Sequence, residues 1–212
     1  MRRLVGSEMC IRDRSKTGIE VDWEESVGLV GDETWADRGR GWAEPGSVPW
    51  IPEDMASASI GQSVVQITPL QLARAYAVFA NGGWLVTPHL ASGGVDWLAP
   101  EHRRRVDLKP STLQTIREGL RKVVSDGTGF GLNGPGIPPA AGKTGTAEDS
   151  TGGPDHAWFG SYAPYPDGEI VVVAFAQNTP GGGSVHALPM AKKVLAKWQS
   201  LQTVRPPSEL VD

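Results

Sequence analysis

The segment Lys143-Thr144-Gly145-Thr146 combines residue types that suit the binding of an anionic peptide end. Lys143 supplies a positive charge, and the two threonines supply hydroxyl groups that donate hydrogen bonds. If the segment is a strand, alternation places both threonine side chains on one face. Gly145 has no side chain, so a ligand backbone can lie close against the strand. The segment is therefore predicted to dock an extended peptide that ends in a carboxylate, and a backbone N–H at its edge can stabilise an oxyanion in acyl transfer.

A phosphate-binding loop is a rival interpretation, because Ala141-Gly142-Lys143-Thr144 resembles the end of that motif. The motif needs a glycine five positions before Gly142, where Ile137 stands, and no helix is predicted after Thr144. These mismatches argue against nucleotide binding. A second Lys-Thr-Gly begins at Lys16, in a predicted loop, and context favours the copy at Lys143.

Metal and cofactor chemistry is not predicted. The histidines are scattered without the spacing of metal ligands, at His89, His102, His156 and His186. Asp155-His156 could border a site, but it is a weaker candidate than the segment at Lys143. Polar residues are common in loops whether or not a site is near.

Helices are predicted where caps and apolar periodicity coincide. Thr68-Pro69 opens one helix, and Asn81-Gly82-Gly83 closes it. Ser111 and Gln114 have the spacing of a capping box at the start of a second helix, which Gly127-Thr128-Gly129 ends. A third helix is predicted from Ser184 to about Ser200, with one apolar side formed by Leu188, Ala191, Val194, Leu195 and Trp198.

Three short strands are predicted in the last third of the chain, at residues 140–148, 157–165 and 169–177. Pro166-Asp167-Gly168 indicates a tight turn, so the latter two should form an antiparallel hairpin. The continuous apolar run Ile170 to Phe175 is typical of a strand covered on both faces. Residues 15–56 are predicted to be irregular. The expected fold class is α+β, an antiparallel sheet with packed helices.

Composition excludes several classes of protein. Hydrophobic residues make up 39% of the 212 residues and charged residues 21%, as in globular proteins. The net charge of −4 gives no support to nucleic-acid binding. The run Ile170 to Ala176 is too short to span a bilayer.

The two ends of the chain are predicted to lie outside the folded domain. Leu4 to Arg14 is similar to the translation of a transposase-type sequencing adaptor, so residues 1–14, with the lone Cys10, are interpreted as foreign. Residues 15–200 are assigned to one domain. A flexible tail is predicted over residues 201–212.

Several segments together resemble the transpeptidase domain of class B penicillin-binding proteins, most closely the penicillin-binding protein 2 type. They are Thr17-Gly18-Ile19-Glu20, Ser59-Ile60-Gly61-Gln62, Thr68-Pro69-Leu70-Gln71, Ala80-Asn81-Gly82-Gly83, residues 142–147, Trp158 to Pro164 and Gly181-Gly182-Gly183. The resemblance covers about residues 16–200 and rests on the order and spacing of these pieces.

The resemblance implies a β-lactamase/transpeptidase-like fold and a serine acyl-transfer enzyme that cross-links peptidoglycan from D-Ala-D-Ala stem peptides. It implies that Lys143 shapes the electrostatics of the cleft, that Thr144 and Thr146 hold the substrate carboxylate beside Gly145, and that the Thr146 N–H forms half of an oxyanion hole. It implies stem peptides and β-lactams as ligands and no nucleic-acid partner. For the full-length protein it implies an anchor in the cytoplasmic membrane, a domain facing the cell wall, and cell-wall elongation partners.

The other two motifs of this family are absent from the chain. No serine has a lysine three positions later, and no asparagine has a serine two positions before it. The chain is therefore expected to be a C-terminal fragment that is inactive alone, because the nucleophilic serine is missing. Two alternatives remain open: a non-catalytic module that binds peptidoglycan or a partner, and the transpeptidase part of a bifunctional class A penicillin-binding protein.

Overall fold

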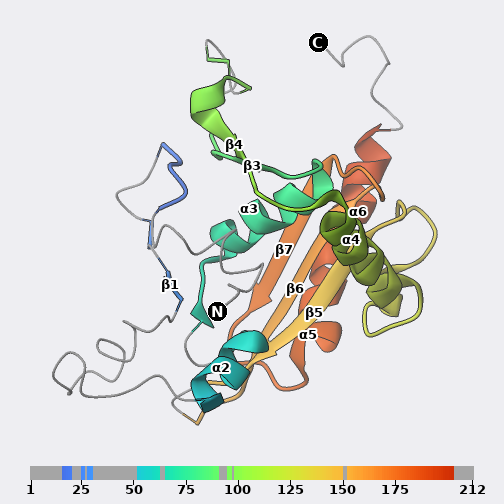
Figure 1. Cartoon of the computed structure of the whole chain (residues 1–212). Helices are drawn as coiled ribbons and strands as arrows, with labels where there is room; N and C mark the ends of the chain where they lie inside the picture. Colours follow the sequence, from blue (N-terminus) through green and yellow to red (C-terminus); the bar gives the residue numbers. More distant parts are fainter. Residues whose placement is uncertain are drawn as a thin grey trace, which may run out of the picture. The chain divides into compact units, whose positions relative to one another are not determined.

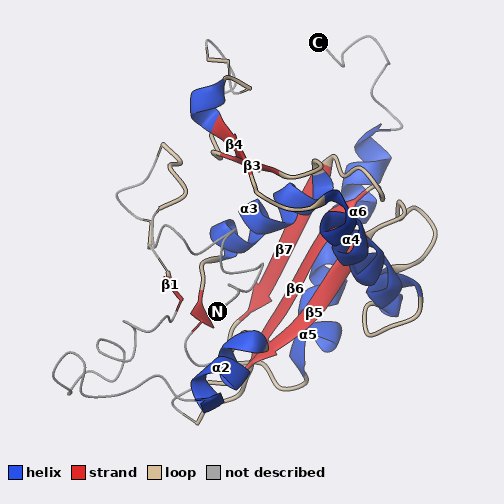
Figure 2. Cartoon of the chain, viewed as in Figure 1, coloured by secondary structure: helices blue, strands red, loops and turns tan. Residues whose placement is uncertain are grey.

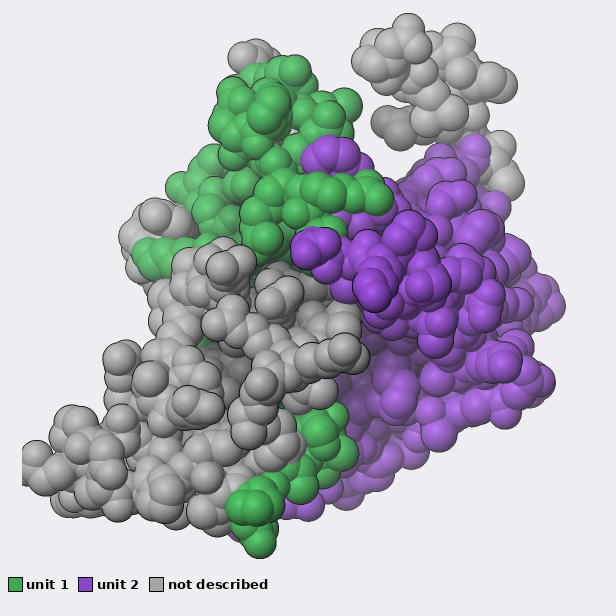
Figure 3. Space-filling view, viewed as in Figure 1, with its two compact units in different colours: residues 1–75, 85–106 green, residues 76–84, 107–212 purple. Residues whose placement is uncertain are grey.

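The computed structural model describes residues 16–20, 25–26, 28–30, 52–62, 65–90, 95–96, 98–149 and 152–202. The described helices and antiparallel strands confirm the predicted α+β class. The chain divides into two compact units, one of residues 1–75 and 85–106 and the other of residues 76–84 and 107–212 (Figure 3). Residues 1–14 and most of the predicted tail lie outside the described residues, so their assignment stays a prediction.

The first unit contains short elements. Strand β1 (Leu29–Val30) pairs antiparallel with β2 (Val65–Gln66), and helix α2 spans Pro52–Ser59. Strand β3 (Trp84–Val86), which starts at the unit boundary, pairs with β4 (Arg103–Arg105), which follows the 3₁₀ turn η2 (Pro100–His102). The predicted irregular stretch 15–56 lies mostly outside the described residues, and within it the structure has β1 and the start of α2.

Helix α3 (Pro69–Ala80) confirms the predicted caps. The Gln71 N–H donates to Thr68 Oγ1 at 3.1 Å, and the Gln71 side chain accepts from the Thr68 N–H at 2.9 Å. This reciprocal pair is a capping box. At the other end, Gly82 adopts φ +79°, and the Gly83 N–H donates to the Val78 carbonyl. The glycines therefore end the helix in the left-handed conformation that they tolerate.

Helix α4 (Pro110–Ser125) begins differently from the prediction. Its N-cap is Lys109, without a side-chain cap hydrogen bond, and the Gln114 side chain donates to Glu118 instead. The capping box predicted at Ser111 is wrong, because Pro110 takes the first helical position with its fixed φ and draws Ser111 into the first turn. The helix ends before Gly127, as predicted. The 3₁₀ turn η3 (Phe130–Leu132) follows.

The second unit is built on a three-stranded sheet in the order β5-β6-β7 (Figure 1). Strands β5 (Ala141–Ala147), β6 (His156–Ala163) and β7 (Ile170–Ala176) are antiparallel neighbours, which confirms the predicted hairpin. The pair Ala163↔Ile170 closes the ladder, so the connection runs over residues 164–169 and is longer than the predicted tight turn. Pro164 and Pro166 have no N–H to continue the ladder.

The two faces of this sheet pack against different helices. On one face, Phe159 and its neighbours pack against α6 (Ala187–Gln202). The buried cluster on this face comprises Val124, Leu132, Ala140, Ala157, Phe159, Ala163, Val172, Ala174, Ala187, Leu188, Ala191 and Leu195. On the other face, the Tyr76 ring from the second half of α3 lies against Gly160, where an added Cβ would stand 2.9 Å from the Tyr76 hydroxyl. Figure 2 shows the three strands of this unit and α6 together.

Strand β7 is covered less than the sequence predicts. Val172 and Ala174 are buried, whereas Val171, Val173 and Phe175 are only half-buried. The buried residues share the face of Phe159, which packs against α6, and the half-buried ones alternate to the opposite face, so that opposite face of β7 is covered less completely.

The C-terminal helix also differs from its prediction. A short helix α5 (Gly182–Val185) has Gly181 as its N-cap, and α6 then starts at Ala187, so Ser184 is not the cap. Leu188, Ala191 and Leu195 are buried as predicted, but Val194 is 46% exposed, which places it off the buried side. Helix α6 runs through Gln202, so the first two residues of the predicted tail, at 201–202, are helical.

Candidate active site

Strand β5 forms one edge of its sheet and exposes the Lys-Thr-Gly-Thr segment. In the part of the chain that the structure describes, β6 is its one strand neighbour. Lys143 and Thr146 are exposed, and Thr144 and Gly145 are half-buried. The segment therefore lies on the surface at an open strand edge, where an extended ligand can reach both main chain and side chains.

The register of the sheet assigns the site residues to its two faces. Lys143 pairs with Gly160, whereas Thr144 pairs with Phe159 and Thr146 with Ala157. Residues that pair across two strands project to the same face, and successive residues alternate. Thr144 and Thr146 therefore share the face of Phe159, and Lys143 starts from the opposite face.

Lys143 nevertheless reaches the strand edge. Its Nζ donates to the Thr144 carbonyl oxygen at 2.6 Å and lies 3.5 Å from Thr144 Oγ1. The Thr144 carbonyl is thus accessible from outside the sheet. The N–H and C=O of one strand residue point the same way, and every second residue shares that direction. By this rule the N–H of Thr146 points to the same edge as the Thr144 carbonyl.

Thr128 is a further candidate for the site, and no sequence motif points to it. It belongs to the loop after α4, and its Oγ1 lies 2.8 Å from Thr144 Oγ1. The sequence indicates only that Thr128 belongs to the Gly-Thr-Gly that ends the helix. The signal that was available is a hydroxyl residue held between two glycines, but nothing in the sequence places that loop beside β5. The structure brings Thr128, Lys143 and Thr144 together in one row of hydrogen-bonded side chains.

The two glycines that begin α5, Gly182 and Gly183, pack closely against β5 and β6. Gly182 has φ +70°, and a Cβ there would collide with the Thr146 hydroxyl. A Cβ on Gly183 would stand 2.5 Å from the Gly145 carbonyl oxygen and would also collide with the Trp158 carbonyl. The start of α5 therefore approaches β5 and β6 this closely only because these two positions lack side chains.

Two buried tyrosines pack behind β6. Burial is the main cause that raises the pKa of the Tyr76 phenol, and the nearby Tyr162 raises it further. Burial likewise raises the pKa of Tyr162 to about 12, although the positive charge of Arg117 acts in the opposite direction. Both phenols are therefore neutral at physiological pH.

The other sequence candidates are not assembled into a site. Among the described residues, no three His, Cys, Asp or Glu side chains cluster as metal ligands would. His156 accepts a hydrogen bond from the Asn178 N–H at 3.1 Å and stacks edge-on against Phe175, so it is held in packing. At the other Lys-Thr-Gly copy, Thr17 is buried and its N–H donates to the Glu25 carboxylate at 2.8 Å. Because β5 continues through Thr144 to Ala147, no helix N-terminus follows Lys143 for a phosphate.

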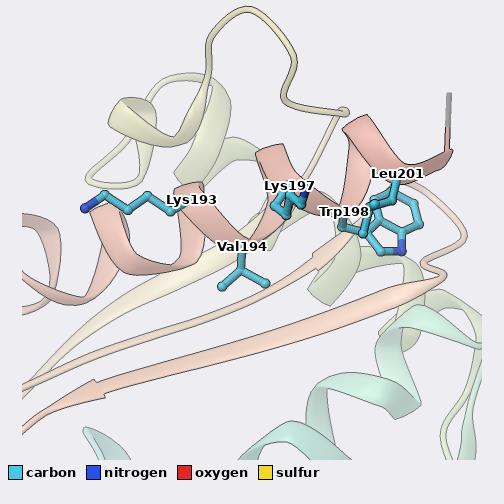
Figure 4. A pocket seen from close by; sticks show the side chains of 5 residues that line it. All are labelled: Lys193, Val194, Lys197, Trp198 and Leu201. Atoms are coloured by element: carbon cyan, nitrogen blue, oxygen red, sulfur yellow. The ribbon is translucent and has the colours of Figure 1, made fainter. Parts of the chain in front are cut away.

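A separate hollow of about 410 Å³ lies along α6 (Figure 4). Its lining comes entirely from that helix: Lys193, Val194, Lys197, Trp198 and Leu201. None of these residues belongs to β5. In the described residues no helix combines the length and the apolar character that crossing a membrane requires.

An antiparallel sheet packed against helices, with a lysine-threonine strand at its edge, has the architecture of the transpeptidase fold class. The family profile of the penicillin-binding protein transpeptidase domain matches residues 21–196. The chain belongs to this family.

Two curated relatives are peptidoglycan D,D-transpeptidases named MrdA. The chain is 32% identical over 201 residues to the protein of Haemophilus influenzae, covering 84% of this chain and 30% of that protein. It is also 32% identical over 203 residues to the protein of Acinetobacter baumannii, covering 86% of this chain and 29% of that protein. The chain thus spans about 30% of the length of these relatives.

Solved structures of penicillin-binding protein 2 are similar in fold. The protein from Helicobacter pylori, in its complex with MreC, aligns with a TM-score of 0.71 and 25% identity, covering 90% of this chain and 33% of that chain. The protein from Pseudomonas aeruginosa, in complex with WCK 5153, aligns with a TM-score of 0.68 and 30% identity, covering 84% of this chain and 38% of that chain.

Proposed function

We propose that the edge of β5 binds the terminal carboxylate of a D-Ala-D-Ala stem peptide, as part of a peptidoglycan D,D-transpeptidase domain. The observation that carries this proposal is the hydrogen-bonded row of Lys143 Nζ, Thr144 Oγ1 and Thr128 Oγ1 on an open strand edge. A carboxylate is an acceptor-only group, and charge-assisted hydrogen bonds to it are stronger than neutral ones.

Each residue of the segment has a distinct task in this proposal. Lys143 supplies a positive field, and the hydroxyls of Thr144 and Thr146 donate to the carboxylate. Gly145 leaves room for the peptide backbone beside the strand. The Thr146 N–H, which shares the direction of the accessible Thr144 carbonyl, donates to the oxygen that becomes negative when the scissile carbonyl is attacked.

The reaction that this edge would serve is acyl transfer in two steps. A serine hydroxyl attacks the carbonyl carbon of the penultimate D-Ala, an ester forms, and the terminal D-Ala leaves as the amine that takes up the proton. The amine of a neighbouring stem peptide then displaces the serine and forms the cross-link. The 212 residues contain no Ser-x-x-Lys, so the chain contributes the docking edge and not the nucleophile.

We extend the proposal to the whole protein through its relatives. The relatives named peptidoglycan D,D-transpeptidase support a role at the cell wall, and we propose that the full protein is anchored in the cytoplasmic membrane. The complex of a penicillin-binding protein 2 with MreC in Helicobacter pylori supports an elongation partner of the same kind.

A titration followed by amide NMR tests the docking edge. The ¹⁵N-labelled chain is titrated with diacetyl-L-Lys-D-Ala-D-Ala, and separately with the same peptide ending in a carboxamide. We expect shifts at residues 143–147 and tighter binding of the acid. Lys143→Gln should weaken binding of the acid about fivefold, the scale of one exposed ion pair. Lys193→Gln in the α6 hollow is the matched control and should leave binding unchanged. Equal binding of acid and carboxamide, or shifts confined to α6, would refute the proposal.

A further inference from the structure

Thr128 is held in a fixed position by the loop that carries it. The N–H groups of Gly127 and Gly129 both donate to the Val123 carbonyl, at 3.1 Å and 2.9 Å. A Cβ on Gly127 would stand 3.0 Å from backbone atoms of Val123, so the loop is packed tightly onto the end of α4. The Phe130 N–H donates back to Gly127 and closes the turn. The Thr128 hydroxyl is thus presented to β5 by a loop whose backbone is fixed on both sides.

The number of hydrogen bonds that the Thr144 hydroxyl can donate and accept limits the direction of its bond with Thr128. A hydroxyl has one hydrogen to donate and two acceptor positions. Lys143 Nζ, at 3.5 Å, can only donate to Thr144 Oγ1. The contact between Thr128 and Thr144, at 2.8 Å, can run in either direction. If Thr144 donates to Thr128, its single hydrogen is used and cannot reach a ligand.

The opposite direction prepares Thr144 for an anion. If Thr128 donates, both acceptor positions of Thr144 Oγ1 are filled, by Thr128 and by Lys143. The Thr144 hydrogen must then point away from both, towards a ligand at the strand edge. Hydrogen bonds in such a chain polarise one another, which strengthens the terminal donor.

We propose that Thr128 is a positioning residue that makes Thr144 a dedicated donor and thereby selects ligands ending in a carboxylate over those ending in a carboxamide. A carboxylate accepts at both oxygens, whereas a carboxamide presents an NH₂ group that needs an acceptor. With both acceptor positions of Thr144 occupied, that NH₂ group finds no partner on this hydroxyl. The inference rests on the proposed docking of a peptide carboxylate at β5.

The test compares the affinities of the diacetyl-L-Lys-D-Ala-D-Ala acid and carboxamide for four forms of the chain. They are the wild type, Thr128→Val, Thr128→Ser and the control Thr115→Val, which removes an exposed hydroxyl that bonds within α4. We expect Thr128→Val to weaken binding of the acid about fivefold, the scale of one hydrogen bond. The same substitution should change the affinity for the carboxamide by less than about twofold. Thr128→Ser should restore the preference, and Thr115→Val should match the wild type. Should Thr128→Val fail to fold, Thr128→Ala removes the same hydroxyl with a smaller side chain.

The outcomes distinguish the role of Thr128 from the docking of a peptide carboxylate at β5. If Thr128→Val keeps the wild-type preference while Lys143→Gln loses affinity, the role of Thr128 is refuted and docking at β5 stands. If Thr128→Val weakens acid and carboxamide equally, Thr128 acts only on the structure of the site, and the inference is again refuted. If the wild type does not prefer the acid, both the docking proposal and the inference fall.

Discussion

Tyr162 carries a buried hydroxyl without a hydrogen-bond partner among the described residues. An unpaired buried polar group costs stability, and its removal by an isosteric apolar residue is neutral or favourable. We expect Tyr162→Phe to unfold at pH 7 with a free energy equal to that of the wild type or up to about 1 kcal/mol greater. Urea denaturation followed by tryptophan fluorescence measures the difference. A loss of more than about 1 kcal/mol would show that the hydroxyl is paired in solution.

The same tyrosine makes stability depend on alkaline pH. Its pKa is 10.0 unfolded and about 12 folded, mainly because of burial, so the folded state holds the proton more tightly. The stabilisation is complete below pH 10 and is lost as pH rises from 10 towards 12. By about pH 11 the free energy of unfolding of the wild type should have fallen by about 1.4 kcal/mol more than that of Tyr162→Phe. Parallel urea curves at pH 9 and pH 11 check this; equal losses in both proteins would contradict the burial of the phenol.

Gly183 is a position where a single methyl group should disturb the site. Its Cβ would collide with the Trp158 carbonyl and crowd the backbone of Gly145. We expect Gly183→Ala to destabilise the chain by about 1–3 kcal/mol, because backbone atoms cannot move aside cheaply. Gly119→Ala is the matched control: it lies inside α4 with nothing within 4 Å of the added Cβ. That variant should gain about 0.5–1 kcal/mol from helix propensity. A stable Gly183→Ala would mean that α5 does not pack against β5.

The sequence predicts the chemistry of the β5 segment but not its surroundings. Lys143, Thr144 and Thr146 could be chosen from residue type and alternation alone, because strand geometry is local. Thr128 could not be chosen, since its contact with Thr144 spans 16 residues and depends on how α4 and its loop fold back onto β5. The roles assigned to the segment remain predictions that the titrations test.

Arg117 links two helices of the second unit. Its guanidinium donates to the carbonyls of Phe79 and Ala80 at the end of α3, at 2.6 Å and 3.0 Å, and its side chain is 12% exposed. We expect Arg117→Met to lower the free energy of unfolding by about 1–3 kcal/mol, because it removes the charged donor from the carbonyls of half-buried Phe79 and buried Ala80. Thermal or urea unfolding provides the measurement.

Asp167 gives a control for this prediction. It lies 3.3 Å from Arg117 but is 83% exposed, so solvent screens the pair. Asp167→Asn should change stability by no more than about 0.5 kcal/mol. If Asp167→Asn costs as much as Arg117→Met, the ion pair and not the helix-end carbonyls would account for the role of Arg117.

Elements with strong local signals were predicted well, and their ends less well. The caps of α3 follow from Thr68 and Gln71, whose side chains bond to their own helix. At α4 the same three-residue spacing, between Ser111 and Gln114, predicts a capping box that does not form, because Pro110 starts the helix one residue earlier. Val194 was assigned to the buried side of the last helix, but that helix starts at Ala187, and the apolar side that packs on the sheet passes through Leu188, Ala191 and Leu195.

At the scale of the whole chain, the proposed docking edge occurs in a sequence that contains no Ser-x-x-Lys. The chain spans about 30% of the MrdA relatives. We expect that a fluorescent penicillin leaves no denaturation-resistant label on this chain, because no serine has a lysine three positions later, the spacing at which the family's lysine activates its serine. In-gel fluorescence beside a complete penicillin-binding protein 2 as the labelled control makes the comparison. A labelled band from this chain would show that another of its residues is acylated.

Docking of a peptide carboxylate at β5 is tested most directly by a crystal structure of the chain with diacetyl-L-Lys-D-Ala-D-Ala bound. We predict the peptide to lie extended along the open edge of β5, with its terminal carboxylate within hydrogen-bond distance of the Thr144 and Thr146 hydroxyls and beside Lys143 Nζ. A carboxylate bound away from β5, for example at Lys193 and Lys197 on α6, would contradict the account.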